Sequence, residues 1–229
     1  MVNVFSFCLY GGSNPRYYVP LLENIKHIHQ YFPSWQAWIY FAPDVDPAYV
    51  QVLQSYSNVV LHPTHTLGPA NMILRFYAID DPSVDLMFVR DADSLIHWKD
   101  RWAIHRFLEQ PQYIAHTIRD HKDHTSKLMG GLWGLRRSAG LNIQEQYQAY
   151  LRNPIDMGIA HDQNFLSSYI YPQVLPHLLV HYSNGRTFAN ETAEAFPFEW
   201  SEEIYCGKIE MPTHSGLRFA NGRFTTRVQ

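Results

Sequence analysis

The sequence has few cysteines. Only Cys8 and Cys206 occur among its 229 residues. Two thiols are too few for a disulfide-stapled scaffold, and they cannot form a thiolate zinc site alone, because structural zinc sites usually use several cysteines. We therefore expect a reducing compartment and two buried cysteines that behave as small apolar side chains.

Long apolar runs and an excess of positive charge are also missing. Apolar runs such as residues 86–89 and 178–180 are far shorter than the roughly 20 residues that span a bilayer, and no charged segment precedes an apolar stretch at the start. We expect no membrane span and a cytoplasmic location. The 18 Lys and Arg against 21 Asp and Glu give a formal charge of −3. This balance does not favour a nucleic-acid partner, since binding to a phosphate backbone depends on basic residues.

The sequence is rich in core-forming residues. Hydrophobic residues make up 46% of the chain and aromatic residues 15%, with 17% charged. This composition excludes extensive disorder. We find no internal repeat and no low-complexity linker, so we expect a single domain over residues 1–229.

Strand-like and helix-like segments alternate through the first 94 residues. Strands are expected at residues 4–9, 38–42, 59–61 and 86–89, with helices at 18–31, 47–56 and 72–79 between them. This alternation predicts an α/β fold, in which a mostly parallel sheet has helices on both faces. The later pattern is less regular, with expected helices at 98–108 and 162–168, strands at 113–118 and 178–181, and mostly loop after 183.

An Asp-x-Asp motif, Asp91 and Asp93, directly follows the fourth expected strand. Ligands of parallel sheets bind at the carboxyl ends of the strands. Two neighbouring carboxylates repel each other unless a cation neutralises them, and magnesium or manganese prefers carboxylate and phosphate oxygens. The motif therefore favours a metal site that binds a diphosphate. The alternative is an ordinary surface turn, where Asp is common.

Several segments together resemble the metal-dependent GT-A glycosyltransferases. They are Arg-Asp-Ala-Asp-Ser at 90–94, Ile-Arg-Asp-His at 118–121 with His124, Gly-Gly-Leu-Trp-Gly at 130–134, His-Asp-Gln-Asn-Phe-Leu at 161–166 and Val-His-Tyr at 180–182. Their order is similar to that of small polysaccharide-building transferases of bacteria and large DNA viruses, and more loosely to the glycogenin-like branch. The resemblance implies a GT-A-like nucleotide-binding sheet, with a nucleotide-sugar half (1–94), an acceptor half (95–185) and a C-terminal loop and tail (186–229).

The resemblance also implies roles for individual residues on the donor side. Manganese or magnesium would be held by Asp91, Asp93 and His181. Donor-binding residues would be Leu9, Tyr10, Gly11, Arg75, Arg90 and Asp91. Other interpretations remain open: Arg75 as a solvated helix residue paired with Asp80 or Asp81, Tyr10 and Gly11 as a plain strand end, and His181 as a core or surface histidine. Arg16 is either a further phosphate contact or, as we prefer, a surface residue.

On the acceptor side, Asp162 is the candidate catalytic residue. It would take the proton of the acceptor hydroxyl in an inverting enzyme, or stabilise positive charge on the sugar in a retaining one. A helix N-cap is the rival interpretation. Acceptor contacts would come from Asp120, His124 and Trp133, although Trp133 also suits a core. A zinc site among His116, His121, His124 and His161 is disfavoured, since the spacing lacks a His-Glu-x-x-His core.

The resemblance thus implies an enzyme that transfers a sugar from a nucleotide-diphosphate donor, with UDP as the expected nucleotide, to a hydroxyl of a glycan acceptor. Two alternatives stay open. One is a carbohydrate-binding module without activity. The other, less favoured, is a haloacid-dehalogenase-type phosphatase, in which the first Asp of a similar motif lies near the start of the domain, whereas three strand–helix units precede it here.

Overall fold

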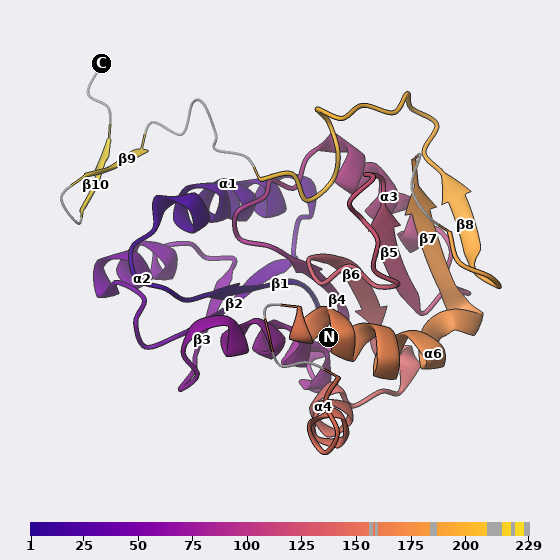
Figure 1. The fold of residues 1–229 in the computed structure, drawn as a ribbon. Coiled ribbons are helices and arrows are strands. Elements are labelled where there is room, and N and C mark those ends of the chain that lie inside the picture. Colours follow the sequence, from indigo (N-terminus) through magenta and orange to yellow (C-terminus); the bar gives the residue numbers. More distant parts are fainter. Residues whose placement is uncertain (156–157, 159, 184–186, 210–216, 221–222, 227–229) are drawn as a thin grey trace.

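An eight-stranded mixed sheet forms the centre of the protein (Figure 1). The computed structural model describes residues 1–155, 158, 160–183, 187–209, 217–220 and 223–226. The strand order is β3-β2-β1-β4-β6-β5-β7-β8, and only β6 runs antiparallel to its two neighbours, β4 and β5. The strands are β1 (Val2–Leu9), β2 (Gln36–Phe41), β3 (Val59–Pro63), β4 (Val84–Arg90), β5 (Ala115–Arg119), β6 (Leu132–Arg136), β7 (Leu178–Tyr182) and β8 (Thr192–Ala195). The predicted α/β fold with a mostly parallel sheet is confirmed.

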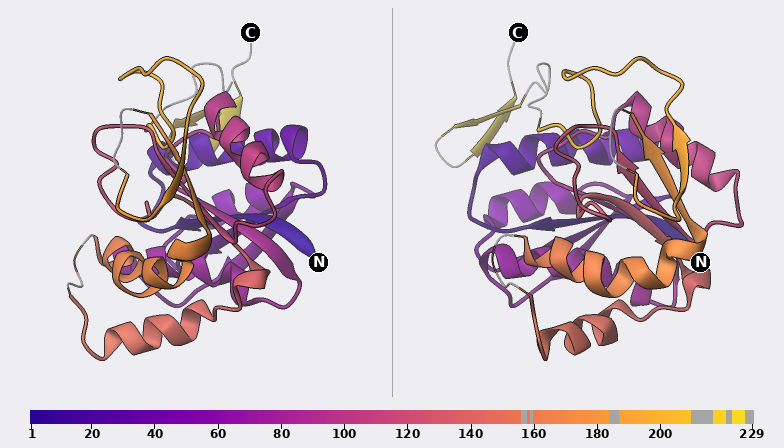
Figure 2. Two further views of the ribbon diagram at one scale, coloured as in Figure 1. Left: turned by 90° about the vertical axis from the view of Figure 1, so that its right-hand side faces the viewer. Right: turned by 45° about the vertical axis from the view of Figure 1, so that its right-hand side comes forward.

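Helices cover both faces of the sheet (Figure 2). One face packs against α1 (Pro15–Tyr31), α2 (Pro47–Gln54) and α3 (Trp98–Leu108). The other packs against the 3-10 helix η1 (Gly68–Asp80), α4 (Ile143–Leu151) and a continuous helical stretch made of α5 (His161–Phe165), the π-helical η3 (Leu166–Ile170) and α6 (Tyr171–Val174). Strands covered on both faces are mostly apolar, and β1 and β4 follow this pattern apart from Asn3, Ser6, Asp85 and Arg90.

Local sequence signals fix where the first helices begin. The side chain of Asn14 accepts a hydrogen bond from the backbone N–H of Arg16 at 3.0 Å, and Pro15 occupies the first helical position of α1. Asp46 and Pro47 do the same for α2, with the Asp46 carboxylate 2.8 Å from the Ala48 nitrogen. Side-chain caps and a proline at the first position are the usual helix-start signals. Because these signals fix the starts of α1 and α2, the loops that precede the two helices lie at the carboxyl ends of the parallel strands β1 and β2.

The structure differs from the sequence expectations mainly after residue 136. Helix α4 was not expected, and β8 forms where a loop was predicted. The strand β8 has only four residues at the sheet edge and is mostly exposed, so it carries no alternating apolar signal. Near the C-terminus, β9 (Leu217–Ala220) and β10 (Arg223–Thr226) pair as a separate hairpin.

Two composition-based expectations can be compared directly with the structure. Both cysteines are buried and free of disulfides, as expected, and burial raises the pKa of Cys8 to about 11. Among the described residues, no helix combines the length and the apolar character needed to cross a membrane.

Candidate functional site

A pocket of about 280 Å³ opens at the carboxyl ends of β1 and β4. These two strands are neighbours and run parallel, so their ends meet at the same edge of the sheet. The pocket is lined by Cys8, Leu9, Tyr10, Tyr17, Met72, Arg75, Asp91, Ala92, Asp93, Gly207 and Ile209. The structure therefore brings the Asp-x-Asp motif together with the loop after β1 and with η1, as the sequence predicted.

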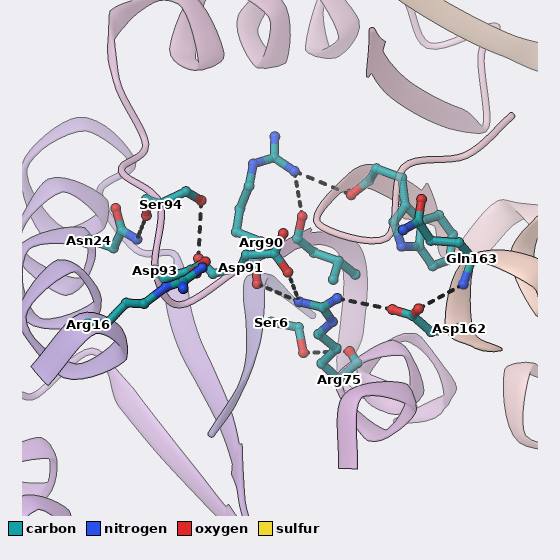
Figure 3. Close-up of polar contacts among 12 residues, drawn as sticks. Ser6, Arg16, Asn24, Arg75, Arg90, Asp91, Asp93, Ser94, Asp162 and Gln163 are labelled. Atoms are coloured by element: carbon teal, nitrogen blue, oxygen red, sulfur yellow. Dashed lines mark hydrogen bonds and ion pairs between the residues drawn. The ribbon is translucent and has the colours of Figure 1, made fainter. Parts of the chain in front are cut away.

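Arg75 lies at the centre of the site (Figure 3). Its side chain is only 4% exposed and pairs with the carboxylate of Asp91, while Nη2 lies 3.3 Å from Oδ2 of Asp162. Nη1 also donates to the carbonyl of Arg90 at 3.2 Å. Burial alone would lower the pKa of Arg75, but the negative charges around it outweigh burial and raise it. Arg75 is thus a fixed cation inside the site, and the alternative of a solvated arginine paired with Asp80 or Asp81 is wrong.

The two aspartates of the motif have different surroundings. Asp91 is 45% exposed on its side chain, whereas the side chain of Asp93 is 12% exposed. Oδ2 of Asp93 accepts from Nε of Arg16 at 2.9 Å and lies 2.8 Å from Nη2 of the same guanidinium. Burial, and next the charge of Asp91, raise the pKa of Asp93. The pair therefore concentrates negative charge that the protein balances with one arginine for each carboxylate.

Two glycines leave room for the carboxylates of the site. A Cβ atom on Gly131 would lie 2.1 Å from Oδ2 of Asp91, and one on Gly130 would lie 2.9 Å from Oδ2 of Asp162. Both distances are shorter than a normal contact, so a side chain at either position would force the carboxylate beside it to move. The Gly-Gly pair before β6 is therefore part of the site, because its backbone lies directly against both acidic groups.

The loop after β1 forms one wall. Leu9 and Tyr10 line the pocket, and burial raises the pKa of Tyr10 to about 12. Gly11 follows at a φ of +85°, and its N–H donates to the carboxylate of Asp44 at 3.0 Å. A positive φ is accessible to glycine at little cost, so this residue lets the chain turn from β1 toward α1. Of the predicted donor residues here, Leu9 and Tyr10 line the pocket, and Gly11 lies at the turn that follows them, outside the lining.

The structure turns Arg90 away from the pocket, contrary to the prediction that it binds the donor. Its guanidinium is buried on α3, where Nε and Nη2 contact Oδ1 of Asp100 at 3.1 and 2.7 Å. Figure 3 shows its side chain pointing away from Arg75. The reason is strand geometry, since successive side chains of β4 project to opposite faces of the sheet.

Asp120 was predicted to contact the acceptor, but the structure does not present its carboxylate to one. It is fully buried and pairs with Lys99 at 2.8 Å, and it accepts from the backbone N–H of Cys206 at 3.1 and 3.2 Å. Burial would raise its pKa, but the contacts with His124 and Lys99 lower it overall. His124 is itself buried, with Nδ1 accepting from the Asp120 N–H at 3.2 Å. Both residues act here in packing the C-terminal segment.

Trp133 also lies in the core. It is fully buried, with its ring edge-to-face against Phe76 at 5.3 Å between centroids. Because β6 is an inner strand with apolar neighbours on the η1 face, the indole offers no surface to a sugar. The core alternative for Trp133 is the one that the structure supports.

His181 is not assembled with the two aspartates. Two strands, β6 and β5, separate β7 from β4. One ring nitrogen of His181 is 2.8 Å from a ring nitrogen of His116, and burial lowers its pKa to about 4. Within the described part of the chain, no group of three or more His, Cys, Asp or Glu side chains is arranged to hold a metal ion. The predicted three-residue set with Asp91 and Asp93 is therefore not formed.

Asp162, the candidate acceptor-side residue, lies beside Arg75, with its Oδ2 3.3 Å from Nη2. It belongs to the first turn of α5, and its Oδ1 accepts from the backbone N–H of Gln163 at 2.8 Å. The N-cap position is Ala160, which makes no side-chain cap bond. The rival interpretation of Asp162 as the N-cap is therefore wrong.

Sequence reasoning missed the contribution of the C-terminal segment. Gly207 and Ile209 line the pocket, and Ile209 forms an antiparallel bridge with Ser94 just after the motif. Figure 1 and the right view of Figure 2 show this segment returning from β8 across the top of the sheet. No local pattern predicts that contact. Arg16, for which a surface role was preferred, was also missed as the partner of Asp93.

No protein-family model matches the chain, and no curated protein matches its sequence. A 4-diphosphocytidyl-2C-methyl-D-erythritol synthase of Anaerococcus prevotii is similar in structure at 12% identity and a TM-score of 0.50, covering 88% of this chain and 94% of its own. A putative nucleotide-diphospho-sugar transferase of Desulfovibrio desulfuricans is similar at 11% identity and 0.50, covering 80% of both chains. These likenesses show the fold, which is the predicted GT-A-like fold of nucleotide-diphospho-sugar transferases.

Proposed function

We propose that this protein transfers a sugar from a nucleotide-diphosphate donor, with a UDP-sugar as first choice, to a hydroxyl of a glycan. The observation that carries this proposal is the pocket at the ends of β1 and β4, which Asp91, Asp93 and Arg75 share. Carboxylates for a metal and a buried guanidinium for phosphate are the groups that a diphosphate requires. The fold agrees with this use of the pocket.

The residues present fit a magnesium or manganese ion. Asp91 and Asp93 offer hard carboxylate oxygens to the same pocket, and the missing side chain of Gly131 leaves room beside Oδ2 of Asp91. Such ions commonly take one or two protein carboxylates together with water and substrate phosphates. When bound, the metal would stabilise the negative charge on the departing diphosphate as a Lewis acid.

The other residues of the site would bind and orient the two substrates. Arg75 would offset diphosphate charge, and the carboxylates of Asp91 and Asp162 hold its guanidinium in place. Leu9 and Tyr10 would receive the base and ribose at the wall of the pocket. Asp162 remains the proposed acceptor-side carboxylate, taking the hydroxyl proton or stabilising charge on the sugar.

The test is a panel of nucleotide sugars, assayed for manganese-dependent release of the nucleoside diphosphate. We expect Asp91→Asn and Asp93→Asn to lower this release at least about 100-fold, since metal stabilisation of the leaving group amounts to several kcal/mol. The matched control is Asp85→Asn, an exposed aspartate on β4 itself, which should leave the rate unchanged.

Other outcomes would point to another function. Undiminished release in both motif variants would contradict the proposal. Calorimetry that detects glycan binding without nucleotide or metal would favour a carbohydrate-binding module. A phosphoryl group trapped on Asp91 would favour a phosphatase, and pyrophosphate release from a nucleoside triphosphate would favour nucleotidyl transfer.

A further inference from the structure

We infer that Arg16 is an exchangeable cation of the site: it neutralises Asp93 before the metal binds, and it moves to the donor diphosphate when a divalent ion takes that carboxylate. The inference rests on the proposed function. Both guanidinium contacts go to the same oxygen of Asp93, Oδ2, at 2.9 Å from Nε and 2.8 Å from Nη2. A metal bound by Asp93 would displace or loosen these contacts.

The two arginines of the site differ in how firmly they are held. Arg75 is buried between two carboxylates and also donates to a backbone carbonyl. Arg16 is 47% exposed on its side chain, and the contacts of its guanidinium recorded among the described residues are Asp93 and the face of the Tyr17 ring at 5.5 Å. The structure thus contains one fixed arginine and one with room to move.

The ion pair between Arg16 and Asp93 is weak, which favours its replacement by a metal ion. An ion pair with a largely exposed arginine contributes about 0–1 kcal/mol, because solvent screens it and the long side chain loses freedom. A doubly charged metal ion competes easily with such a partner. The metal would also have the carboxylate of Asp91 available, whereas among the described residues Asp93 is the one carboxylate that Arg16 contacts. We therefore expect the ion to replace the guanidinium when both are available.

Arg16 is not needed to hold α1 against the motif loop. Asn24, buried on α1, already makes that connection: its Nδ2 donates to the Ser94 carbonyl at 2.7 Å, and its Oδ1 accepts from the Ile96 N–H at 2.8 Å (Figure 3 shows the first contact). Because these buried bonds fasten the two elements together, a purely structural role for Arg16 has little to add. Its charge can serve the ligand instead.

The released guanidinium would remain close to the bound diphosphate. Arg16 lies in the first turn of α1, and the next residue, Tyr17, lines the pocket. The positive end of the helix dipole also lies at this turn. A guanidinium is suited to bidentate contacts with phosphate oxygens. The guanidinium of Arg16 would therefore pass from the Asp93 carboxylate to the phosphate by a change of side-chain rotamer, without movement of the backbone.

The experiment measures two affinities by calorimetry on the full chain: manganese alone, and UDP at saturating manganese. For Arg16→Gln we expect manganese to bind up to about five-fold more tightly, because the competing cation is gone. UDP should bind about ten-fold or more weakly, because charged hydrogen bonds to phosphate are lost. Uridine affinity should not change. Arg16→Lys, which keeps the charge, should give intermediate values.

The matched control is Arg106→Gln, an arginine of similar exposure on α3 that pairs with Glu109 and Glu194; it should alter neither affinity. The inference is overturned if Arg16→Gln weakens both affinities together, as loss of a structural contact would, or if it leaves UDP affinity unchanged. A wild-type protein that binds neither manganese nor UDP refutes the proposed function itself, which separates the two failures.

Discussion

The two halves of the molecule use their charged residues differently. In residues 1–94, the carboxylates of Asp91 and Asp93 line an open pocket. In the later half, charged side chains on and near β5 are sealed in the interior: Lys99 of α3 pairs with Asp120, and Arg119 pairs with Glu191, with all four side chains at most 1% exposed. Asp91 and Asp120 both directly follow a strand, yet only the first is accessible to a ligand.

The difference shows what a charged residue at a strand end can be used for. When its partner is exposed, as Arg16 is at Asp93, the carboxylate is available for binding. When a buried cation and backbone N–H groups surround it, as at Asp120, it holds distant segments of the chain together. Breaking such a buried pair leaves an uncompensated charge in the interior, which is strongly destabilising. Substitution of Asp91 or Asp93 should therefore act through binding, and substitution of Asp120 through stability.

The largest expected effect comes from Asp120→Ala. It leaves the Lys99 ammonium buried without its carboxylate and removes the acceptor of the Cys206 N–H. We expect a loss of about 3–5 kcal/mol in the free energy of unfolding, measured by urea denaturation. Asp120→Asn, which keeps an acceptor, should lose less. The exposed Asp123→Ala should stay within about 0.5 kcal/mol.

One result for Asp120→Ala would contradict the contrast between the accessible Asp91 and the structural Asp120. If Asp120→Ala unfolds at the wild-type urea concentration but loses transfer to the glycan, the carboxylate belongs to the acceptor site after all. The buried environment would then have to open in the presence of the acceptor.

The next effect compares Gly131, which directly precedes β6, with Gly134 inside the same strand. A Cβ on Gly134 would lie 2.5 Å from the buried ring of Phe88, so Gly134→Ala should cost about 1–3 kcal/mol by overpacking. A Cβ on Gly131 would lie 2.1 Å from Oδ2 of Asp91, whose half-exposed side chain can rotate away.

We therefore expect Gly131→Ala to weaken manganese binding while costing less than about 1 kcal/mol of stability. Gly134→Ala should do the reverse. Urea denaturation and manganese calorimetry on both variants measure the difference. Wild-type manganese affinity in Gly131→Ala would mean that Asp91 does not bind the metal from the position described.

The sequence predicts the first half well because local signals determine it. Apolar runs mark β1 and β4, and the rule that ligands collect at strand ends then places Asp91 and Asp93 at a pocket without any knowledge of long-range contacts. The same rule fails for Asp120, because its burial depends on Lys99 from another helix and on Cys206, 86 residues later. Arg90 fails for a related reason, since nothing in the sequence tells which face of β4 its side chain takes. Local patterns give the elements and their order, but they do not identify which charges have buried partners.

A pH-dependent effect concerns His181, a predicted metal ligand that the structure buries against His116. Burial lowers the pKa of His181 to about 4 from 6.5; the charge of Glu194 partly opposes this shift and that of Arg106 adds to it. The unfolded chain therefore takes up a proton near pH 6.5 while the folded protein stays neutral, so stability falls as the pH drops from about 6.5 to about 4. One such group contributes a slope of up to about 1.4 kcal/mol per pH unit.

His181→Gln should reduce that slope, measured by urea denaturation between pH 4.5 and 6.5, and should leave manganese affinity at pH 7 unchanged. The unchanged manganese affinity is the result that distinguishes a structural role of His181 from a role as a metal ligand. His181 could join Asp91 and Asp93 as a metal ligand only if β7, which lies beyond β6 and β5, moved toward them. A marked loss of manganese affinity in His181→Gln would mean that the metal-bound protein rearranges its sheet edge, and the contrast between the accessible carboxylates after β4 and the buried groups around β5 and β7 would not hold.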